Sequence, residues 1–471
     1  MARHLRNPSL VSWPRPMWVV ARWRCPAILL LAFGLWAALA APLRAVPLAS
    51  GRYPITVSGQ ALFIPYVGSH PIDTPQPHVR QLVLAIHSSS YLPQDAYNAV
   101  AAAAGTHTGA ADSVCIFAPQ FLEPAELPAT VPADLLYWST FPFRGTATAR
   151  WGPSAQSVSI SAFEVVDRIL TTLSTSTLFP NLKMIVVVGH SAGGQLVNRY
   201  AVAGRFQNTL EAQREIHMRY LVLAPSSCLY FSAERDPDGD GIFTTLSAAE
   251  IAASACPTMN DYPYGFTNLF SYPSATGATT MRAQYPKRFV FHVVGSADND
   301  PNHSSLGTDC ESMQQGTQRV IRMQTYFRHL QNYFGPSILK RQTMDIVPGI
   351  GHSYSGLLNS TVGRRLLYNV DTIDTDKDGQ LDWAEWMAGT DATNASNQFA
   401  VTWQRTINPD GHELVWPVTP GRRYRILRSN SLSEPFIEVA KMTFADEVTE
   451  GRWAFTIGSA PVFYRVQVEL Q

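Results

Sequence analysis

The sequence has no excess of charge of either sign, few cysteines and no repeat. Lys and Arg together number 36, and so do Asp and Glu, so no basic surplus points to a nucleic-acid partner. Charged residues make up only 15% of the chain and hydrophobic residues 46%, which excludes global disorder. No internal repeat and no low-complexity tract is found. The length of 471 residues predicts several domains, or one large domain with appendages.

Long apolar runs are also scarce, and the main one predicts a cleaved signal peptide over residues 1–45. Arg22 and Arg24 precede an apolar run over 27–41, and residues 38–40 (Ala-Leu-Ala) form a small-x-small cleavage site. That run is shorter than the roughly 20 residues of a membrane-spanning helix, and later runs are interrupted by Pro, Gly or charge. We therefore expect no membrane span in the mature chain and a secreted, periplasmic or cell-surface location.

Four of the five cysteines remain after removal of the leader, which carries Cys25. An even number of cysteines in an oxidising compartment predicts disulfides, and four cysteines allow three connectivities. Cys228 and Cys256 are the closest pair in sequence, so we favour a bond between them over pairings that involve Cys115 or Cys310.

Between about 81 and 369, short apolar runs alternate with helical stretches. Helices are expected over 161–173, where Ser161 and Glu164 form a capping box, and over 311–334. Strands separated by helices predict an α/β fold with a mostly parallel sheet, because runs of unbroken apolarity suit strands covered on both faces. The expected strands are 81–86, 114–118, 183–188, 220–224, 289–294 and 343–347.

Three further segments complete the expected organisation around an α/β domain over 46–370. The stretch of about 226–286 is too long for a plain connection and predicts a cap insertion over a site. Residues 371–397 form an acidic linker, and 398–471 contain six short strand-like runs. We expect these runs to form a small all-β module, hereafter the β module, which is a candidate for binding a surface or polymer.

The sharpest chemical signal is a Gly-x-Ser-x-Gly motif centred on Ser191. It directly follows the expected strand 183–188 and precedes a helical stretch over 194–203. A nucleophile elbow needs an entering strand, a departing helix and glycines where Cβ atoms would collide in the sharp turn. The helix N-terminus also favours negative charge that develops there. The pattern therefore predicts Ser191 as a nucleophile.

A base and an acid are expected after the nucleophile, in the chain order Ser, Asp or Glu, His. Asp298 lies just past the expected strand 289–294, and Asp300 is its rival for the acid. His352 follows the expected strand 343–347 and is placed to accept the Ser191 proton and return it to the leaving group. We expect Asp298 to hold the imidazole tautomer of His352.

Stabilisation of a tetrahedral oxyanion requires two backbone N–H groups fixed in advance. The N–H of Ala192, the residue immediately after the nucleophile, is expected to be one of these two donors. The second donor is expected in the loop after strand 81–86, where we favour Ser89 over Ser88.

The segments FPNLKMIVVVGHSAGGQLVNRY, SISAFEVVDRIL and APQF resemble the α/β-hydrolase superfamily, in particular a group of secreted microbial hydrolases. The resemblance covers about residues 80–370. It implies the α/β-hydrolase fold and hydrolysis of an ester-like bond through an acyl-enzyme, with Ser191, Asp298 and His352 filling the triad positions. One departure is that Ser88 follows His87, where many relatives have glycine after the histidine.

The acidic linker fits a calcium-binding loop position by position. Gly379 stands at the sharp turn, and the backbone carbonyl of Gln380 is the expected ligand at position 7. A second loop begins similarly at Asp236 but carries Ser247 at position 12, so it is either a weaker site or a polar loop. The predicted side-chain ligands of the first loop are Asp374, Asp376, Asp378, Asp382 and Glu385.

Together these features predict a secreted serine hydrolase of the carboxylesterase or lipase kind, with structural Ca²⁺ and no organic cofactor. A peptidase on the same fold is one alternative, and a surface- or polymer-binding protein with a vestigial hydrolase domain is another. The substrate is expected to be a small or polymeric ester. Five aromatic residues of the cap are candidates to line its pocket or to form a small core of their own: Tyr262, Tyr264, Phe266, Phe270 and Tyr272.

Overall fold

The computed structural model describes residues 45–104, 113–146, 148–213, 215–370, 372–406, 411–456 and 462–471. The predicted signal peptide, except for its last residue, lies outside these ranges. Within them, no helix combines the length and the apolar character required to cross a bilayer.

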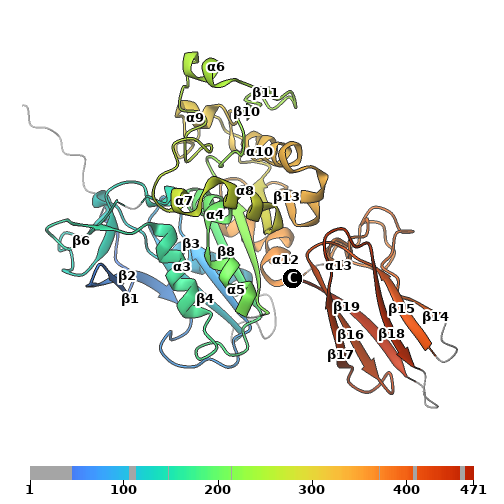
Figure 1. Ribbon diagram of the computed structural model, residues 1–471. Helices are drawn as coiled ribbons and strands as arrows, with labels where there is room; N and C mark the ends of the chain where they lie inside the picture. Colours follow the sequence, from blue (N-terminus) through green and yellow to red (C-terminus); the bar gives the residue numbers. More distant parts are fainter. Residues whose placement is uncertain are drawn as a thin grey trace, which may run out of the picture. The chain divides into compact units, whose positions relative to one another are not determined.

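An eight-stranded sheet forms the centre of the larger part of the chain (Figure 1). Six neighbouring strands run parallel, and the first two strands are joined antiparallel at one edge. This is the mostly parallel α/β sheet that the sequence predicts, and it confirms the expected fold class. In spatial order the strands are β1 (Gly51–Val57), β2 (Gln60–Gly68), β4 (Val114–Pro119), β3 (Gln81–Ile86), β8 (Met184–His190), β9 (His217–Leu223), β12 (Phe289–Gly295) and β13 (Gln342–Val347).

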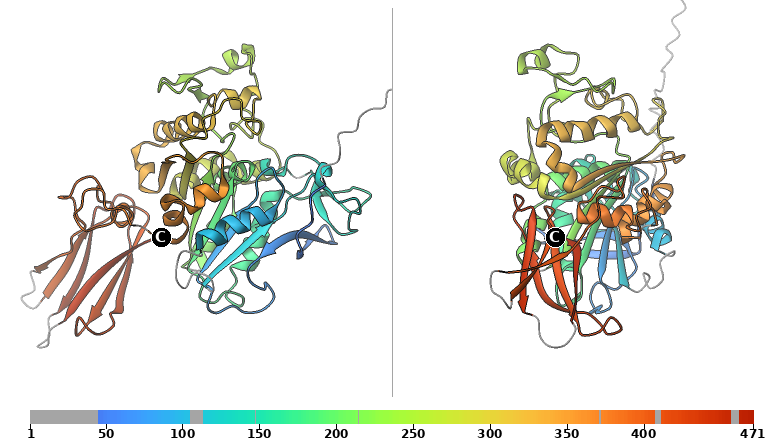
Figure 2. Two further views of the ribbon diagram at one scale, coloured as in Figure 1. Left: turned by 180° about the vertical axis from the view of Figure 1, so that it is seen from behind. Right: turned by 90° about the vertical axis from the view of Figure 1, so that its right-hand side faces the viewer.

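Helices cover both faces of this sheet, which buries the central strands. On one face lie α3 (Ala162–Leu173), α4 (Ala192–Ala203) and α5 (Phe206–Gln213) (Figure 1). The opposite face carries α1 (Pro93–Ala104), α11 (Tyr354–Asn359) and α12 (Thr361–Tyr368) (Figure 2, left). Every residue of β3, β4, β9 and β12 is buried, as unbroken apolar runs predict.

Two features of this part differ from the sequence prediction. The helix expected over 311–334 is divided into α9 (Cys310–Met313) and α10 (Arg319–Phe334). Gly316 breaks it with a φ of +132°, and the Gln318 side chain accepts hydrogen bonds at the new N-terminus. Strands β1 and β2 were not expected, because in β1 buried and exposed residues alternate instead of forming an unbroken apolar run.

The stretch predicted as a cap contains short elements. They are β10 (Glu234–Arg235), β11 (Thr244–Thr245), α6 (Ala248–Ala253), α7 (Ser271–Thr276) and α8 (Ala278–Gln284). Figure 1 draws α6, β10 and β11 close to α9, and a disulfide between Cys256 and Cys310 joins the two regions. A separate small sheet is formed by β5 (Leu136–Trp138), β6 (Thr148–Trp151) and β7 (Gln156–Ser159).

The C-terminal region consists of two three-stranded antiparallel sheets, so the six expected strands are confirmed. Leu414, Trp416, Tyr424 and Ile426 form a small core of their own. Before these sheets lies the short helix α13 (Asp382–Ala388), which follows the acidic loop. One sheet contains β14 (Thr402–Arg405), β15 (Gly411–Pro417) and β18 (Glu450–Thr456), and the other β17 (Ile437–Thr443), β16 (Arg422–Ser429) and β19 (Phe463–Leu470).

Candidate active site

Ser191 occupies a sharp turn between β8 and α4. Its backbone has a φ of 55° and a ψ of −117°, a conformation that a non-glycine residue adopts only under strain. The Ser191 N–H donates to the carbonyl of Leu223 in β9 at 2.9 Å, which fixes the turn at the end of the sheet. The side chain is thereby held at the N-terminus of α4, in the geometry of a nucleophile elbow.

The two glycines that flank this serine leave no room for a side chain. A Cβ at Gly193 would lie 2.5 Å from the carbonyl oxygen of His87 and 2.6 Å from that of Ile86. A Cβ at Gly189 would lie 2.4 Å from the carbonyl oxygen of Gly193. The obstructing atoms belong to the backbone and cannot rotate away, so steric contact alone accounts for both glycines of the motif.

His352 and Asp298 meet where two neighbouring parallel strands end. Asp298 follows β12 and His352 follows β13, and the two loops are tied together by a hydrogen bond from Ala297 N to Ile350 O at 2.9 Å. The Nδ1 atom of His352 lies 2.7 Å from Oδ2 of Asp298. Because this bond occupies Nδ1, the other ring nitrogen, Nε2, is the one available to accept a proton.

Ser191 and His352 lie at the same end of the sheet. The ring of His190, the residue before Ser191, packs against the His352 ring with a centroid distance of 4.3 Å. No hydrogen bond between the Ser191 hydroxyl and His352 occurs among the described residues. Such contacts are often long in ligand-free structures and tighten when substrate binds, so the arrangement is compatible with proton transfer between them.

The carboxylate of Asp298 has a second, buried partner. Its Oδ1 accepts a hydrogen bond from Nη1 of Arg319 at 3.1 Å, and the two side chains are only 2% and 1% exposed. Arg319 also donates to the Ser305 carbonyl at 2.7 Å. The rival acid, Asp300, is exposed and accepts from Asn302 N at 2.9 Å within its own turn. Of the two candidate acids, Asp298 is therefore the one that contacts His352.

The pKa values of this pair favour a neutral imidazole beside an ionised carboxylate. Burial, which is the largest influence, and the positive charge of Arg319 lower the pKa of His352 below 6.5, against the opposing hydrogen bond to Asp298. Burial alone would raise the pKa of Asp298, but His352 and Arg319 outweigh it and hold that pKa below 3.8. Near neutral pH, His352 is thus able to accept a proton.

The predicted oxyanion donors lie beside the same cavity as Ser191. Ala192 is the first residue of α4, where a backbone N–H has no partner within the helix. Ser89 follows β3 and lines the cavity together with Ser191 and Ala192. The alternative, Ser88, is not among the lining residues. The donor roles of Ala192 and Ser89 stay predictions.

This cavity, hereafter the Ser191 cavity, has a volume of about 410 Å³. Its wall is rich in hydroxyl groups and carries one arginine and one aspartate. The lining residues are Ser89, Phe141, Arg144, Ser191, Ala192, Gln195, Ser226, Ser227, Tyr264, Ser304, Ser305, Leu306, Gly307, Asp309 and Ser312.

Of the five cap aromatics, Tyr264 lines the Ser191 cavity. The others pack within the protein: the rings of Tyr262 and Phe270 meet edge to face at 5.0 Å. The hydroxyl of Tyr272 donates to Asp167 at 2.6 Å. Phe266 packs against Phe231. The cap aromatics therefore mostly contribute to the core, which was the second of the two expectations.

The expected disulfide between Cys228 and Cys256 is wrong. Cys256 bonds to Cys310, with the two Cα atoms 5.6 Å apart. Cys228 is a buried free thiol, whose pKa burial raises to about 12, and its backbone N–H donates to the Gln315 side chain at 2.8 Å. Cys115 is likewise buried and free. The prediction relied on proximity in sequence, but Cys256 pairs with Cys310, which is 54 residues away along the chain.

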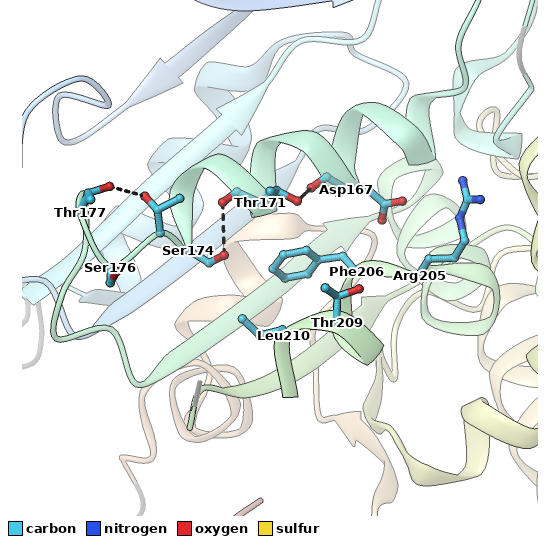
Figure 3. A pocket seen from close by; sticks show the side chains of 10 residues that line it. Asp167, Thr171, Ser174, Ser176, Thr177, Arg205, Phe206, Thr209 and Leu210 are labelled. Atoms are coloured by element: carbon cyan, nitrogen blue, oxygen red, sulfur yellow. Dashed lines mark hydrogen bonds between the residues drawn. The ribbon is translucent and has the colours of Figure 1, made fainter. Parts of the chain in front are cut away.

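A larger cavity, of about 780 Å³, lies between α3 and the start of α5, away from Ser191 (Figure 3). Its lining includes the carboxylate of Asp167 but no histidine. Asp167 already accepts hydrogen bonds from the hydroxyls of Tyr200 at 2.7 Å and Tyr272 at 2.6 Å. With its half-buried acid already paired, this cavity lacks a counterpart of the Ser191, His352 and Asp298 arrangement.

The acidic loop before α13 brings carboxylates together. Asp374, Asp376 and Asp378 each offer an oxygen within 4.8 Å of the others. Among the described residues, one buried oxygen each of Asp376, Asp378 and Glu385 has no hydrogen-bond partner. Both oxygens of Asp382 instead accept from Thr375, and the N–H of Gln380 donates to Asp378 at 2.7 Å. Unpaired buried carboxylate oxygens of this kind fit a hard cation such as Ca²⁺.

The second acidic loop is arranged differently. Asp236 accepts from the backbone N–H groups of Gly239 at 2.8 Å and Gly241 at 3.0 Å, and Arg328 lies 3.8 Å from it. Ser247, at position 12, caps α6 in a capping box. In the part of the chain that the structure describes, no group of three carboxylates converges at this loop.

Three contributors to the site were not foreseen from the sequence. Arg319 supports Asp298, His190 packs against His352, and Arg144 enters the wall of the Ser191 cavity. An arginine on an otherwise apolar helix face is the one signal that would have pointed to Arg319, since buried cations require partners. Arg144 ends a short 3-10 helix (Pro142–Arg144) that is far from the motif in sequence, and no sequence pattern marked it.

The chain is similar to known proteins only in comparisons with solved structures. No family model and no curated protein matches the chain. A poly(aspartic acid) hydrolase from Sphingomonas sp. KT-1 is similar with 19% identity and a TM-score of 0.43, over 69% of this chain and 100% of that one. A poly(3-hydroxybutyrate) depolymerase from Bordetella parapertussis is similar with 17% identity and a TM-score of 0.43, over 69% and 93%. A siderophore hydrolase from Aspergillus nidulans has 12% identity and a TM-score of 0.35, over 70% and 99%.

Proposed function

We propose that this protein is a serine hydrolase that cleaves carboxylic esters through an acyl-enzyme. The observation that carries the proposal is the 2.7 Å contact between His352 and Asp298, next to a serine held in a strained strand-to-helix turn. A buried acid, an oriented imidazole and an adjacent nucleophile are the three groups that this chemistry requires.

In the proposed reaction, Ser191 Oγ attacks the ester carbonyl carbon while His352 Nε2 accepts the hydroxyl proton. The oxyanion that forms receives hydrogen bonds from the N–H groups of Ala192 and Ser89. Collapse of this intermediate breaks the bond to the alcohol oxygen, and His352 returns the proton to that leaving group. Asp298 remains ionised and stabilises the imidazolium.

A water molecule completes the cycle. The water oxygen attacks the acyl-enzyme carbonyl carbon while His352 removes a proton from the water. The second tetrahedral intermediate then collapses and releases the carboxylic acid. The proton held by His352 passes to Ser191 Oγ and restores the free serine. Ester hydrolysis therefore consumes one water and needs no organic cofactor in this scheme.

Labelling with a fluorophosphonate probe and hydrolysis of p-nitrophenyl esters of graded acyl length test the proposal. Wild-type protein and a Ser174→Ala control, which alters a buried serine at the end of α3, should be labelled and active. Ser191→Ala should abolish labelling and hydrolysis without lowering the melting temperature. A folded wild-type protein that is neither labelled nor active would contradict the proposal and favour a surface- or polymer-binding role.

We further propose that the acidic loop binds a structural Ca²⁺ through Asp374, Asp376, Asp378 and Glu385. The unpaired buried oxygens of three of these residues support it. The loop leads directly into α13, whose Trp386 carbonyl accepts a hydrogen bond from Arg422 of β16 at 2.9 Å. A bound cation would thus stiffen the segment that leads from the α/β domain to the β module, outside the catalytic groups.

A location outside the cytoplasm is also proposed, either secreted or at the cell surface or periplasm. The bond between Cys256 and Cys310 supports it, because structural disulfides persist mainly in oxidising compartments. Residues 1–44 of the predicted signal peptide lie outside the described residues.

A further inference from the structure

The wall of the Ser191 cavity contains an arginine without an acidic partner. The guanidinium of Arg144 donates to the Tyr264 hydroxyl at 3.2 Å, and no carboxylate among the described residues lies within ion-pair distance of it. The acid of the wall, Asp309, is already engaged, because its Oδ2 accepts hydrogen bonds from Tyr264 and from the Ser312 hydroxyl at 3.0 Å. Arg144 is thus held in place by a neutral group, and Asp309 and Glu123 act on it only as longer-range opposite charges.

Two further buried arginines contact residues that line the Ser191 cavity. Arg199 is fully buried and donates to the Gln195 side-chain oxygen at 3.1 Å and to the Ser227 hydroxyl at 2.9 Å. Arg322 is also buried and donates to the carbonyl of Ser226 at 2.6 Å. Neither has a carboxylate within 4 Å in the described ranges. All their hydrogen-bond partners are neutral, and Asp309 acts on Arg322 only as a longer-range opposite charge.

The charge count around the cavity is positive. Arg144, Arg199, Arg319 and Arg322 contribute four positive charges. Three carboxylates oppose them: Asp298 pairs with Arg319, Asp309 lines the wall, and Glu123 lies within electrostatic reach of Arg144. In a partly buried cavity such a surplus acts on a bound ligand with little screening by water.

A neutral donor points the same way. The Gln195 oxygen accepts hydrogen bonds from Arg199 and from the Ser227 hydroxyl at 3.0 Å, which fixes the amide orientation. The NH₂ group of Gln195 therefore points away from Arg199 and Ser227, and no hydrogen bond from this group is found among the described residues. Together with Arg144 it presents N–H donors at the cavity wall, which is the pattern that a carboxylate accepts.

The cavity belongs to the acyl side of the proposed reaction. Both predicted oxyanion donors, Ala192 and Ser89, line it, and an oxyanion hole holds the acyl carbonyl. His352, which would protonate the leaving alcohol, does not line it. A substrate acyl chain that extends from the carbonyl therefore leads into the positively charged cavity.

Resting on the proposed esterase function, we propose that the Ser191 cavity binds a carboxylate at the far end of the substrate's acyl chain. Arg144 is the specificity-determining residue that recognises this carboxylate. The preferred substrates are thus half-esters of dicarboxylic acids, including the ester units of an acidic polymer, and neutral alkyl esters are poorer.

Two methyl esters of equal size test this inference. Monomethyl glutarate ends in a carboxylate, and methyl glutaramate ends in the isosteric, uncharged carboxamide, so hydrolysis followed by pH-stat isolates the effect of charge. We expect wild-type protein to favour the anionic ester in kcat/KM by about tenfold or more. Raising the ionic strength should reduce this preference.

Variants assign the preference to one side chain. Arg144→Gln should reduce the ratio of the two kcat/KM values by about tenfold, mainly through KM for the anionic ester, and Arg144→Lys should restore part of it. Arg282→Gln is the matched control, because Arg282 is a half-buried cap arginine on α8 that does not line the cavity. Equal loss for both esters in Arg144→Gln, or a wild-type preference for the amide ester, would overturn the inference.

A binding measurement separates this inference from the proposed function. Isothermal titration of wild-type protein with glutarate, against glutaramide as the neutral probe, requires no turnover and no variant. Binding of glutarate but not of glutaramide supports the inference even if neither ester is hydrolysed. The absence of hydrolysis would in that case refute the esterase proposal only. Hydrolysis of esters without any binding of glutarate would overturn the inference and leave the esterase proposal standing.

Discussion

Replacement of Arg319 by methionine removes the buried partner of Asp298 and should change both stability and pH dependence. The substitution deletes the 3.1 Å ion pair and the 2.7 Å bond to the Ser305 carbonyl. Breaking a buried pair by removing one partner costs about 3–5 kcal/mol, because an uncompensated charge is left behind. Against a typical total of roughly 5–15 kcal/mol, the protein should stay folded with a Tm lower by about 5–10 °C.

The activity should then report on His352. Arg319 lowers the pKa of His352, so its removal should raise that pKa. In the proposed reaction the neutral imidazole is the active form, so the acid limb of kcat/KM for a neutral ester should move to higher pH in Arg319→Met. The assay is p-nitrophenyl acetate hydrolysis between about pH 5 and 9, read at the isosbestic wavelength, at a temperature where circular dichroism shows a folded variant.

A control on the same helix keeps the test specific. Arg328 in α10 is 44% exposed and lies near Asp236, not near the triad, so Arg328→Met should leave the acid limb where it is. If the limb of folded Arg319→Met stays in place or moves to lower pH, the electrostatic account of the His352–Asp298–Arg319 arrangement is wrong.

Three further predictions concern the elbow, the acidic loop and the disulfide. Gly193→Ala should cost about 1–3 kcal/mol in melting experiments and about a hundredfold in kcat/KM, because its Cβ would force backbone atoms apart at the site; near-normal values for both would refute the steric argument. Calcium at a hundredfold excess over Kd should stabilise the fold by about 2.7 kcal/mol, with EDTA or Glu385→Gln removing the effect and the initial hydrolysis rate nearly unchanged; loss of activity on chelation at constant fold would show instead that the metal serves catalysis. Peptide mapping of unreduced protein should recover Cys256 linked to Cys310, and detection of both as alkylatable thiols would contradict the structure.

The sequence was most informative where local rules determine structure. Unbroken apolar runs located the parallel strands, and the spacing of glycines around Ser191 located the strand-to-helix turn. The placement of Asp298 and His352 followed from a simple property of parallel sheets, whose strands all end at the same edge. Here the relevant contacts are either within a few residues or imposed by topology, so a single sequence contains them.

Contacts between segments far apart in the chain were out of reach. Arg319 meets Asp298 through the packing of α10, and Cys256 finds Cys310 across 54 residues, although Cys228 is nearer in sequence. The cavity wall was harder still to predict, since Arg144 and Tyr264, which contact each other there, are 120 residues apart in the sequence. The conformation of such segments depends on the whole fold, and so the wall of the Ser191 cavity could not be derived before the structure.

The close approach of Gly193 to the loop after β3 has a consequence for engineering. The segments that carry Ala192 and Ser89 touch through backbone atoms, with no side chain between them. The spacing of the two predicted donors thus depends on backbone contacts that require Gly193, whereas wall residues such as Arg144 and Gln195 line the cavity with their side chains. If the proposed function holds, libraries that vary the wall while keeping Gly189 and Gly193 should therefore change which acyl group is accepted without displacing the proposed catalytic groups.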